Sequence, residues 1–401
     1  MNGNGYSREE ALNKLIEIQT QNTIPFILFR LADWVAPIRQ KAEKAIQLFL
    51  VEENTIYFIR NHKLINWLLH VERNDLSELY NQIVTSVASK RIDQDQLKTL
   101  NEGDRFFYFK SLVKTGLLDN DLINEMVTDK YYLIRILLIK YLDNAEDVKT
   151  VLAKLLSDKS QKVRQEAVHL LANQNINVYK TILETLVFDS STTVRVEARR
   201  LLSKIYDCDF KNLYQKSLSK KQFIIGSILG LSEVSDQDEI PLLHEYLKSD
   251  RAKIRTASLF GIYNLDTVLG TEKAYQILET ENPVSTKRAA ETILLKQGID
   301  FERLRKLYDL TDVTGKKIIL RLFNRYSGWS VAGDFLKTLI EDNVQLQSMA
   351  RVFLESWNRY TIRLATNQRQ EDKDYVMSWY EKVKGLGIKV SDNIPFVFRE
   401  K

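Results

Sequence analysis

The chain has 401 residues, of which 44% are hydrophobic and 28% charged, a balance that excludes wholesale disorder. It contains only 5 Pro and 14 Gly, whereas average usage would give roughly 20 and roughly 28, so we expect long helices joined by short, repetitive loops. The formal net charge of +5, from 58 basic and 53 acidic residues, is too small by itself to indicate a class of partner.

The N-terminal residues do not form the basic and then apolar pattern of a signal peptide. The longest uncharged apolar stretch, 222–232, is far shorter than the ~18 residues that a membrane span needs. The single cysteine, Cys208, lies between Asp207 and Asp209, whose carboxylates disfavour a thiolate. We therefore expect a cytoplasmic protein without a membrane span and without a nucleophilic cysteine.

The first elements in chain order are an N-terminal cap helix within 1–22 and the first copy of an internal repeat. Each copy has an Asp, then after four further residues a Val or Ile followed directly by Arg, and in most copies an Ala three residues after the Arg. Copies begin at Asp33, Asp129, Asp158, Asp189 and, one residue shorter, Asp250. The Arg position is occupied in turn by Arg135, Arg164, Arg195, Ile225, Arg255 and Lys287, at steps of 29, 31, 30, 30 and 32 residues. A nearly fixed period of this size indicates a repeat architecture.

Each repeat is predicted to be a pair of helices. The first half carries apolar residues at helical spacing, as in 148–156, and the second half places Val163, Ala167 and Leu171 on one face. The Asp opens the turn between them, where its carboxylate is expected to accept from exposed amides at the start of the second helix. Such a pair buries its apolar faces only by stacking on its neighbours.

A helix–turn–helix repeat of about 30 residues with this motif resembles the HEAT repeat, in particular the short bacterial variety named after the phycobilisome lyases. The resemblance is strong over 129–295 and recognisable at 23–50. It implies an all-α, right-handed α-solenoid, an armadillo/HEAT-type superhelix of about ten helix pairs. It also implies that the motif Asp and Arg side chains form a ladder between adjacent repeats and are structural. The ladder residues would be Asp33, Arg39, Arg135, Asp158, Arg164, Asp189, Arg195, Asp250 and Arg255.

The domain organisation follows from where the motif is clear. The solenoid is expected over 23–354, with degenerate repeats at 51–128 and 296–354, between the N-terminal cap at 1–22 and a C-terminal cap at 355–401. The polar run 367–374 is expected to be a flexible loop.

No spacing in the chain indicates a catalytic, metal or cofactor site. The four histidines, His62, His70, His169 and His244, include no pair at the i, i+4 spacing that places two imidazoles on one helix face. We therefore expect a protein that is not an enzyme and that uses neither a metal nor a cofactor.

Two groups of residues are candidates for contacting a partner. Polar positions off the apolar face of the second helices would face a partner protein: Gln165, His169, Arg199, Arg200, Thr256 and Arg288. Basic residues near successive turns would form a basic ridge: Lys220, Lys221, Lys248, Arg251, Lys253, Lys287, Lys316 and Lys317. Acidic residues such as Asp236 and Asp250 lie among the latter.

Three functions fit these features. The first is a non-catalytic scaffold that binds a partner protein along the concave face of the solenoid. The second is nucleic-acid binding through the basic ridge. Some bacterial DNA glycosylases resemble this architecture and use Trp, Asp and Arg, so that Asp33 and Trp34 would be the residues to consider. The third is a chromophore lyase or its helper, suggested only by the name of the repeat variety.

Overall fold

The computed structural model describes residues 4–142, 145–171, 175–280, 283–326, 328–361 and 369–390, without the side chains of 360 and 361. Over these residues the secondary structure consists of α-helices and short 3₁₀ turns, with no β-strand. The all-α prediction is confirmed, and the helix pairs stack as an α-solenoid does. The chain divides into two compact units, Met1–Leu186 with Val196–Ile205, and Val187–Arg195 with Tyr206–Lys401.

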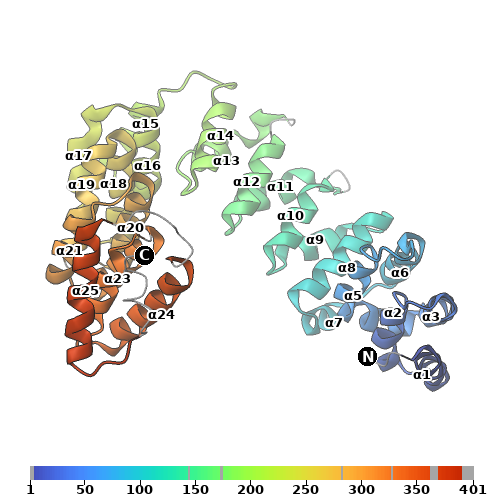
Figure 1. Ribbon diagram of the computed structural model, residues 1–401. Helices are drawn as coiled ribbons and strands as arrows, with labels where there is room; N and C mark the ends of the chain where they lie inside the picture. The colour runs from blue at the N-terminus through green and yellow to red at the C-terminus, as the bar shows by residue number, and fades with distance from the viewer. Residues whose placement is uncertain are drawn as a thin grey trace. The chain divides into compact units, whose positions relative to one another are not determined.

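The first unit contains helices α1 to α13, blue to green in Figure 1. Short 3₁₀ turns at Gln21–Thr23, Glu52–Asn54 and Ile176–Tyr179 lead into α2, α4 and α13. The helices are α1 (Gly5–Ile18), α2 (Ile24–Arg30), α3 (Ala36–Phe49), α4 (Thr55–Arg60), α5 (His62–Leu68), α6 (Ser77–Ser89), α7 (Gln94–Thr99), α8 (Glu102–Thr115), α9 (Asn120–Thr128), α10 (Tyr132–Ile139), α11 (Val148–Leu156), α12 (Gln161–Leu170) and α13 (Lys180–Leu186).

Helix α14 (Thr192–Leu202) has residues in both units, and the second unit continues through α25, yellow to red in Figure 1. A 3₁₀ turn at Gln237–Glu239 precedes α17. The helices are α15 (Phe210–Ser219), α16 (Ile224–Val234), α17 (Ile240–Tyr246), α18 (Ala252–Leu265), α19 (Thr267–Glu279), α20 (Val284–Gln297), α21 (Phe301–Leu310), α22 (Val313–Tyr326), α23 (Val331–Thr338), α24 (Val344–Thr361) and α25 (Gln370–Gly385).

Packing within each unit follows one rule. The two helices of a pair contact each other; for example, α15 packs on α16 and α17 packs on α18. The second helix of each pair also packs on the second helix of the next pair. In the second unit this series runs α16, α18, α20, α22 and α24, and in the first it runs α6, α8, α10 and α12. The apolar faces that one pair cannot cover are therefore covered by its neighbours.

Many of the residues predicted to form these faces are buried, although Val148 and Leu170 are only half-buried. In α11 the side chains of Val151, Leu152, Leu155 and Leu156 are buried, and in α14 Val194 and Ala198 are fully buried. Ala at this position leaves room for the neighbouring helix, because a larger side chain would separate the two axes.

The two ends differ from the internal repeats. Helix α1 packs on α2 and α3, and α25 packs on α23. The proposed boundary at 355 falls inside α24 and so separates no two elements. Of the expected loop 367–374, residues 370–374 belong to α25, and 367 and 368 lie outside the described residues.

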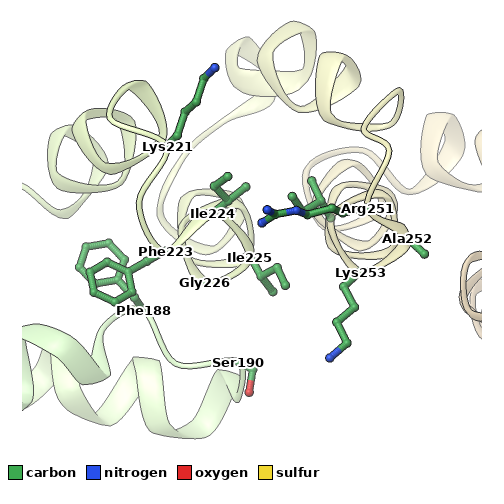
Figure 2. Close-up of a pocket in the computed structure, with 11 residues that line it drawn as sticks. Phe188, Ser190, Lys221, Phe223, Ile224, Ile225, Gly226, Arg251, Ala252 and Lys253 are labelled. Atoms are coloured by element: carbon green, nitrogen blue, oxygen red, sulfur yellow. The ribbon is translucent and has the colours of Figure 1, made fainter.

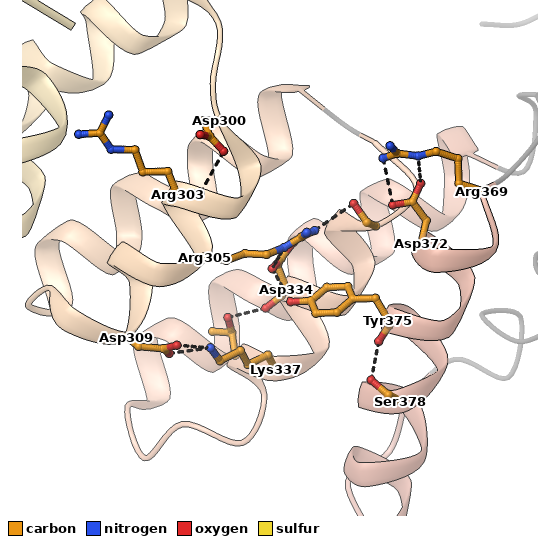
Figure 3. A network of polar contacts seen from close by, with 12 residues as sticks. Asp300, Arg303, Arg305, Asp309, Asp334, Lys337, Arg369, Asp372, Tyr375 and Ser378 are labelled. Atoms are coloured by element: carbon orange, nitrogen blue, oxygen red, sulfur yellow. Dashed lines mark hydrogen bonds and ion pairs between the residues drawn. The ribbon is translucent and has the colours of Figure 1, made fainter. Parts of the chain in front are cut away.

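A buried polar network holds α25 in place (Figure 3). Asp334 of α23 accepts hydrogen bonds from Arg305 Nε at 2.9 Å, from Arg305 Nη2 at 3.0 Å and from the Tyr375 hydroxyl at 2.7 Å. The Tyr375 ring lies against Gly333. A Cβ atom on residue 333 would lie only 2.5 Å from Tyr375 Cε1, too close for a side chain at this position. Burial raises the pKa of Asp334 above its ordinary value, although Arg305 and Tyr375 act in the opposite direction. The network joins α21, α23 and α25.

Candidate functional site

The repeat motif of the first unit makes ion pairs between consecutive repeats. Arg135 of α10 contacts Asp158 through Nε–Oδ2 at 2.6 Å and Nη2–Oδ1 at 2.9 Å. Arg105 contacts Asp129 in the same two-bond geometry, at 2.8 and 3.0 Å. Parallel N–H···O bonds of this kind combine charge with a fixed orientation. We propose that these contacts are structural and set the register of one repeat on the next.

The sequence motif did not identify Arg105, nor Arg8, which pairs with Asp33 through two bonds of 2.9 Å. Arg105 lies 30 residues before Arg135, and Arg8 lies 31 residues before Arg39. The repeat period was therefore the signal that could have found both.

The motif Asp has a different local role from the one expected. Asp158 Oδ1 accepts from the amide of Ser160, the N-cap residue of α12, at 2.7 Å, and Asp129 Oδ1 accepts from Tyr131, the N-cap of α10, at 2.7 Å. The carboxylate thus fixes the loop before the helix rather than an amide inside its first turn.

The motif Arg side chains also bind the main chain of their own repeat. Arg164 Nη1 donates to the carbonyl of Asp158 at 2.7 Å, and Arg39 Nη1 donates to that of Asp33 at 2.8 Å. In each case the carbonyl lies six residues before the Arg. Arg195 Nη1 reaches the Asp189 carbonyl in the same way, at 2.6 Å.

The ladder pattern changes at α15 and α16. In this repeat Ile225 occupies the Arg position. The Asp position, six residues earlier in the chain, is occupied by Ser219. Arg195, with no Asp at 219 to meet, instead pairs with Glu233 of α16, with Nε–Oε2 at 3.2 Å. Sequence reasoning missed Glu233 because it lies outside the motif.

The shorter copy at Asp250 does not follow the pattern either. Arg255 Nη1 donates to the carbonyl of Ser249, which is six residues earlier, so Ser249 takes the place that the motif Asp has elsewhere. Asp250 is exposed, and no contact of its side chain is found within the described ranges. Asp250 therefore does not belong with the ladder residues.

Three of the eight basic-ridge residues have other roles. Lys287 is fully buried and its Nζ lies 2.8 Å from Asp312 Oδ1, a Lys counterpart of the ladder contacts. Lys316 pairs with Glu341 at 2.8 Å, and Lys317 donates to the side chain of Gln345. The ridge as predicted is therefore wrong at Lys287 and Lys316, because carboxylates of the following repeat already pair with their charges. Lys317 contacts a neutral amide, which leaves its charge uncompensated. Lys220, Lys221, Lys248, Arg251 and Lys253 are exposed.

Three of these exposed cations lie around one pocket, which we call the basic pocket (Figure 2). It has a volume of about 600 Å³ and lies at the N-terminal ends of α16 and α18, with its wall completed by the turn before α14. Its lining residues are Phe188, Ser190, Lys221, Phe223, Ile224, Ile225, Gly226, Arg251, Ala252, Lys253 and Ile254. The lining contains no acidic residue.

The turn from α15 to α16 shapes one side of the basic pocket. The Lys221 amide donates to the Leu218 carbonyl and the Gln222 amide to the Ser217 carbonyl, both at 2.9 Å. Helices that end with this pair of hydrogen bonds usually have Gly at the position of Lys221. Lys221 has φ 54° and Phe223 has φ 44°, both left-handed. That conformation costs a non-Gly residue about 1–2 kcal/mol.

Buried hydroxyls hold this turn in place. Ser217 Oγ donates to the Gln222 carbonyl at 2.7 Å, and Ser227 Oγ donates to Ser217 Oγ at 2.9 Å. A strained backbone that is held in this way is more frequent at functional sites than elsewhere.

An aromatic stack forms the apolar wall. The rings of Phe188 and Phe223 lie parallel with centroids 4.9 Å apart, and the buried ring of Tyr214 meets Phe188 edge-on at 5.5 Å. Phe223 nevertheless remains 55% exposed. At Gly226 a Cβ atom would come within 1.8 Å of the Phe188 carbonyl oxygen. Only glycine therefore lets α16 approach the turn before α14 so closely.

The three cations of the basic pocket are arranged differently around it. Figure 2 shows Arg251 reaching across the pocket toward Ile224 and Ile225, Lys253 extending along the opening, and Lys221 pointing outward. Within the part of the chain that the structure describes, none of the three forms an ion pair. The result is an apolar hollow with uncompensated positive charge at its edge.

The predicted partner-binding residues do not form a comparable site. Arg199 is buried, with only 9% of its surface exposed, so its place among exposed contact residues is wrong. Arg200 is exposed and pairs with Glu197. His169 and Arg288 are exposed, and Gln165 and Thr256 are half-buried.

The arrangement at Asp33 and Trp34 does not favour base excision. The Asp33 carboxylate is buried and accepts from Arg8, from Arg30 at 3.3 Å and from the Val35 amide at 3.1 Å. Burial raises the pKa of Asp33, but these hydrogen bonds outweigh it and hold that pKa below its ordinary value. Trp34 is exposed, and the guanidinium of Arg73 lies 3.8 Å from its ring centroid. Asp33 is thus fully bonded and poorly suited to act as a base.

The described residues contain no group of three or more His, Cys, Asp and Glu side chains that could hold a metal ion. Nor does any helix among them have the length and apolar character to cross a membrane.

The chain matches no protein-family model and no curated protein. One similar solved structure comes from work on the structural basis of tubulin recruitment and assembly by microtubule polymerases with tumor overexpressed gene (TOG) domain arrays. The two chains are 13% identical, the comparison covers 92% of this chain and 91% of the other, and the TM-score is 0.28. A likeness this distant does not bear on function.

Proposed function

We propose that the chain is a non-catalytic scaffold of the HEAT-repeat kind that binds a partner protein, and that the basic pocket is a point of contact. The observation that carries this proposal is the pocket itself, an apolar hollow of about 600 Å³ edged by Lys221, Arg251 and Lys253. Hollows of this size that combine apolar walls with a few charged groups are typical binding sites.

The distribution of charge favours a protein over a nucleic acid. A phosphate backbone is bound by a long series of cations. Here Lys287 and Lys316 are bound by Asp312 and Glu341, which shortens the exposed series to the surroundings of the basic pocket.

Position-specific photo-crosslinking tests this function. A photoreactive phenylalanine analogue replaces Phe223 in the basic pocket or, as a control, Val268 of α19, which is 74% exposed. In the native cells we expect a discrete protein adduct from position 223 and none from position 268. Crosslinks to nucleic acid alone, or the same adducts from both positions, would contradict the proposal.

A further inference from the structure

The basic pocket lies where the ladder is interrupted. In several other repeats the side chain at the Arg position extends from the second helix to the turn of the following repeat, as Arg105 extends to Asp129 and Arg135 to Asp158. In α16 this position is Ile225, whose side chain lines the pocket, and the following turn supplies Arg251 and Lys253 to the same pocket. The short, apolar Ile225 thus leaves open the space that an Arg would fill.

From this geometry, and resting on the function proposed above, we infer that the basic pocket binds an acidic peptide segment that carries one bulky apolar side chain. The apolar side chain would enter the hollow beside Ile225 and against the exposed ring of Phe223. The carboxylates on either side of it would pair with Arg251, Lys253 and Lys221.

Charge complementarity supports the acidic character of this segment. The pocket has three exposed cations at its edge and no acidic lining residue; the nearest carboxylates along the chain, Asp189 and Asp250, are not part of the lining. An arginine that is free to form two parallel bonds is well suited to a carboxylate. The N-terminal ends of α16 and α18 have no side-chain cap, so their amides add to the positive potential.

The shape of the pocket supports the apolar side chain. The walls formed by Ile224, Ile225 and Ile254 belong to helices, and Phe223 is held by the stack with Phe188 and by its pinned turn. A preformed apolar hollow lets a ligand bind without ordering the protein first.

The first test measures the binding of fluorescein-labelled synthetic peptides to the full chain by fluorescence anisotropy. The probe is a short peptide with a central Phe between Asp and Glu residues. One matched peptide carries Asn and Gln in place of the acids, and another carries Ala in place of Phe. We expect the acidic Phe peptide to bind about tenfold or more tightly than either matched peptide, which corresponds to about 1.4 kcal/mol.

The second test uses variants of the protein. Ile225→Arg should fill the apolar hollow with a long side chain, so that affinity for the acidic Phe peptide falls about tenfold or more while the chain remains folded. The double variant Arg251→Glu/Lys253→Glu should have the same effect. Its control, Lys306→Glu/Arg325→Glu, changes the net charge equally at exposed residues outside the pocket and should bind like the unmodified protein. Circular dichroism and thermal unfolding verify that each variant is folded.

The inference is overturned if the Asn/Gln peptide binds as well as the acidic one, or if a single-stranded oligonucleotide binds the pocket more tightly than the peptide does. It is also overturned if no peptide binds while crosslinking at position 223 still yields a protein adduct. In that last case the proposed scaffold function stands and only the chemistry of the partner is wrong.

Discussion

Arg195 and Glu233 form an ion pair that joins α14 to α16, with the Arg195 side chain only 1% exposed. The guanidinium also donates to the Asp189 carbonyl at 2.6 Å and to Thr192 Oγ1 at 3.0 Å. This contact takes the place of the Arg-to-turn contacts in the first unit, and it fixes the helix that carries Ile225 and Gly226.

The first prediction concerns this pair. Arg195→Ala should lower the free energy of unfolding by about 3–5 kcal/mol, because it removes the fully buried member of an ion pair whose other member, Glu233, is only 12% exposed. Urea unfolding followed by circular dichroism measures the loss. Arg200→Ala removes an ion pair with Glu197 in which the Arg200 side chain is 45% exposed, so it should change the stability by only about 0–1 kcal/mol. Equal losses in the two variants would show that Arg195 has no structural role.

The second prediction concerns the close approach at Gly226. Gly226→Ala should destabilise the second unit by at least about 1–3 kcal/mol, since the added methyl would overlap the rigid main chain of Phe188. The matched control is Gly385→Ala near the end of α25, where a Cβ atom meets nothing within 4 Å. A Gly226→Ala protein as stable as this control, measured by thermal unfolding, would mean that α16 and the turn before α14 are not so closely packed.

The third prediction concerns the network beneath α25. Tyr375→Phe should cost about 1.5–3 kcal/mol, the usual loss for a hydrogen bond to a charged group. Asp334→Ala should cost more, about 3–5 kcal/mol, because Arg305 then loses its buried partner. Ser378→Ala removes only an exposed hydroxyl from α25 and should stay within about 0.5 kcal/mol of the unmodified protein. Chemical denaturation ranks the three variants, and the reverse order would refute the role of Asp334.

The fourth prediction concerns acid stability. The pKa of Asp33 lies below its ordinary value in the folded protein, so its ionised form adds stability above the unfolded-state pKa of roughly 3.9. That contribution is lost as the pH falls further, through the lower pKa of the folded state. Unfolding free energy measured from neutral pH down to about pH 2 should therefore fall less steeply for Asp33→Asn than for the unmodified chain. Asp250→Asn, which makes the same change of charge at an exposed side chain, is the matched control.

The sequence predicted the helix pairs well because their signal is local and repeated. Val151, Leu152 and Ala198 were assigned to buried faces from spacing alone, and they are buried. The resemblance to the HEAT repeat implied a ladder of motif Asp and Arg side chains, and the contact of Arg135 with Asp158 has that form. Period, apolar spacing and turn residues all act within one or two neighbouring repeats, which is the range over which a single sequence is informative.

The candidate site was only partly predictable, for two physical reasons. First, exposure depends on the next repeat: Lys287 and Lys253 look alike in sequence, but only Lys287 finds a carboxylate there. Second, Phe223 is a large apolar residue that is 55% exposed, and it lies in a turn where its backbone is left-handed. Neither the partner of a side chain in a neighbouring repeat nor a left-handed backbone at a non-glycine residue follows from periodicity.

The position of α25 has a consequence for self-association. A stack of similar layers offers, at its last layer, a surface suited to one more layer, and a second molecule could supply it. Here Val376, Tyr380 and Val383 of α25 are buried in the same core as Phe335 of α23, so α25 covers this layer. Deleting α25 would uncover that core, and the shortened protein should then join end to end into filaments or aggregates.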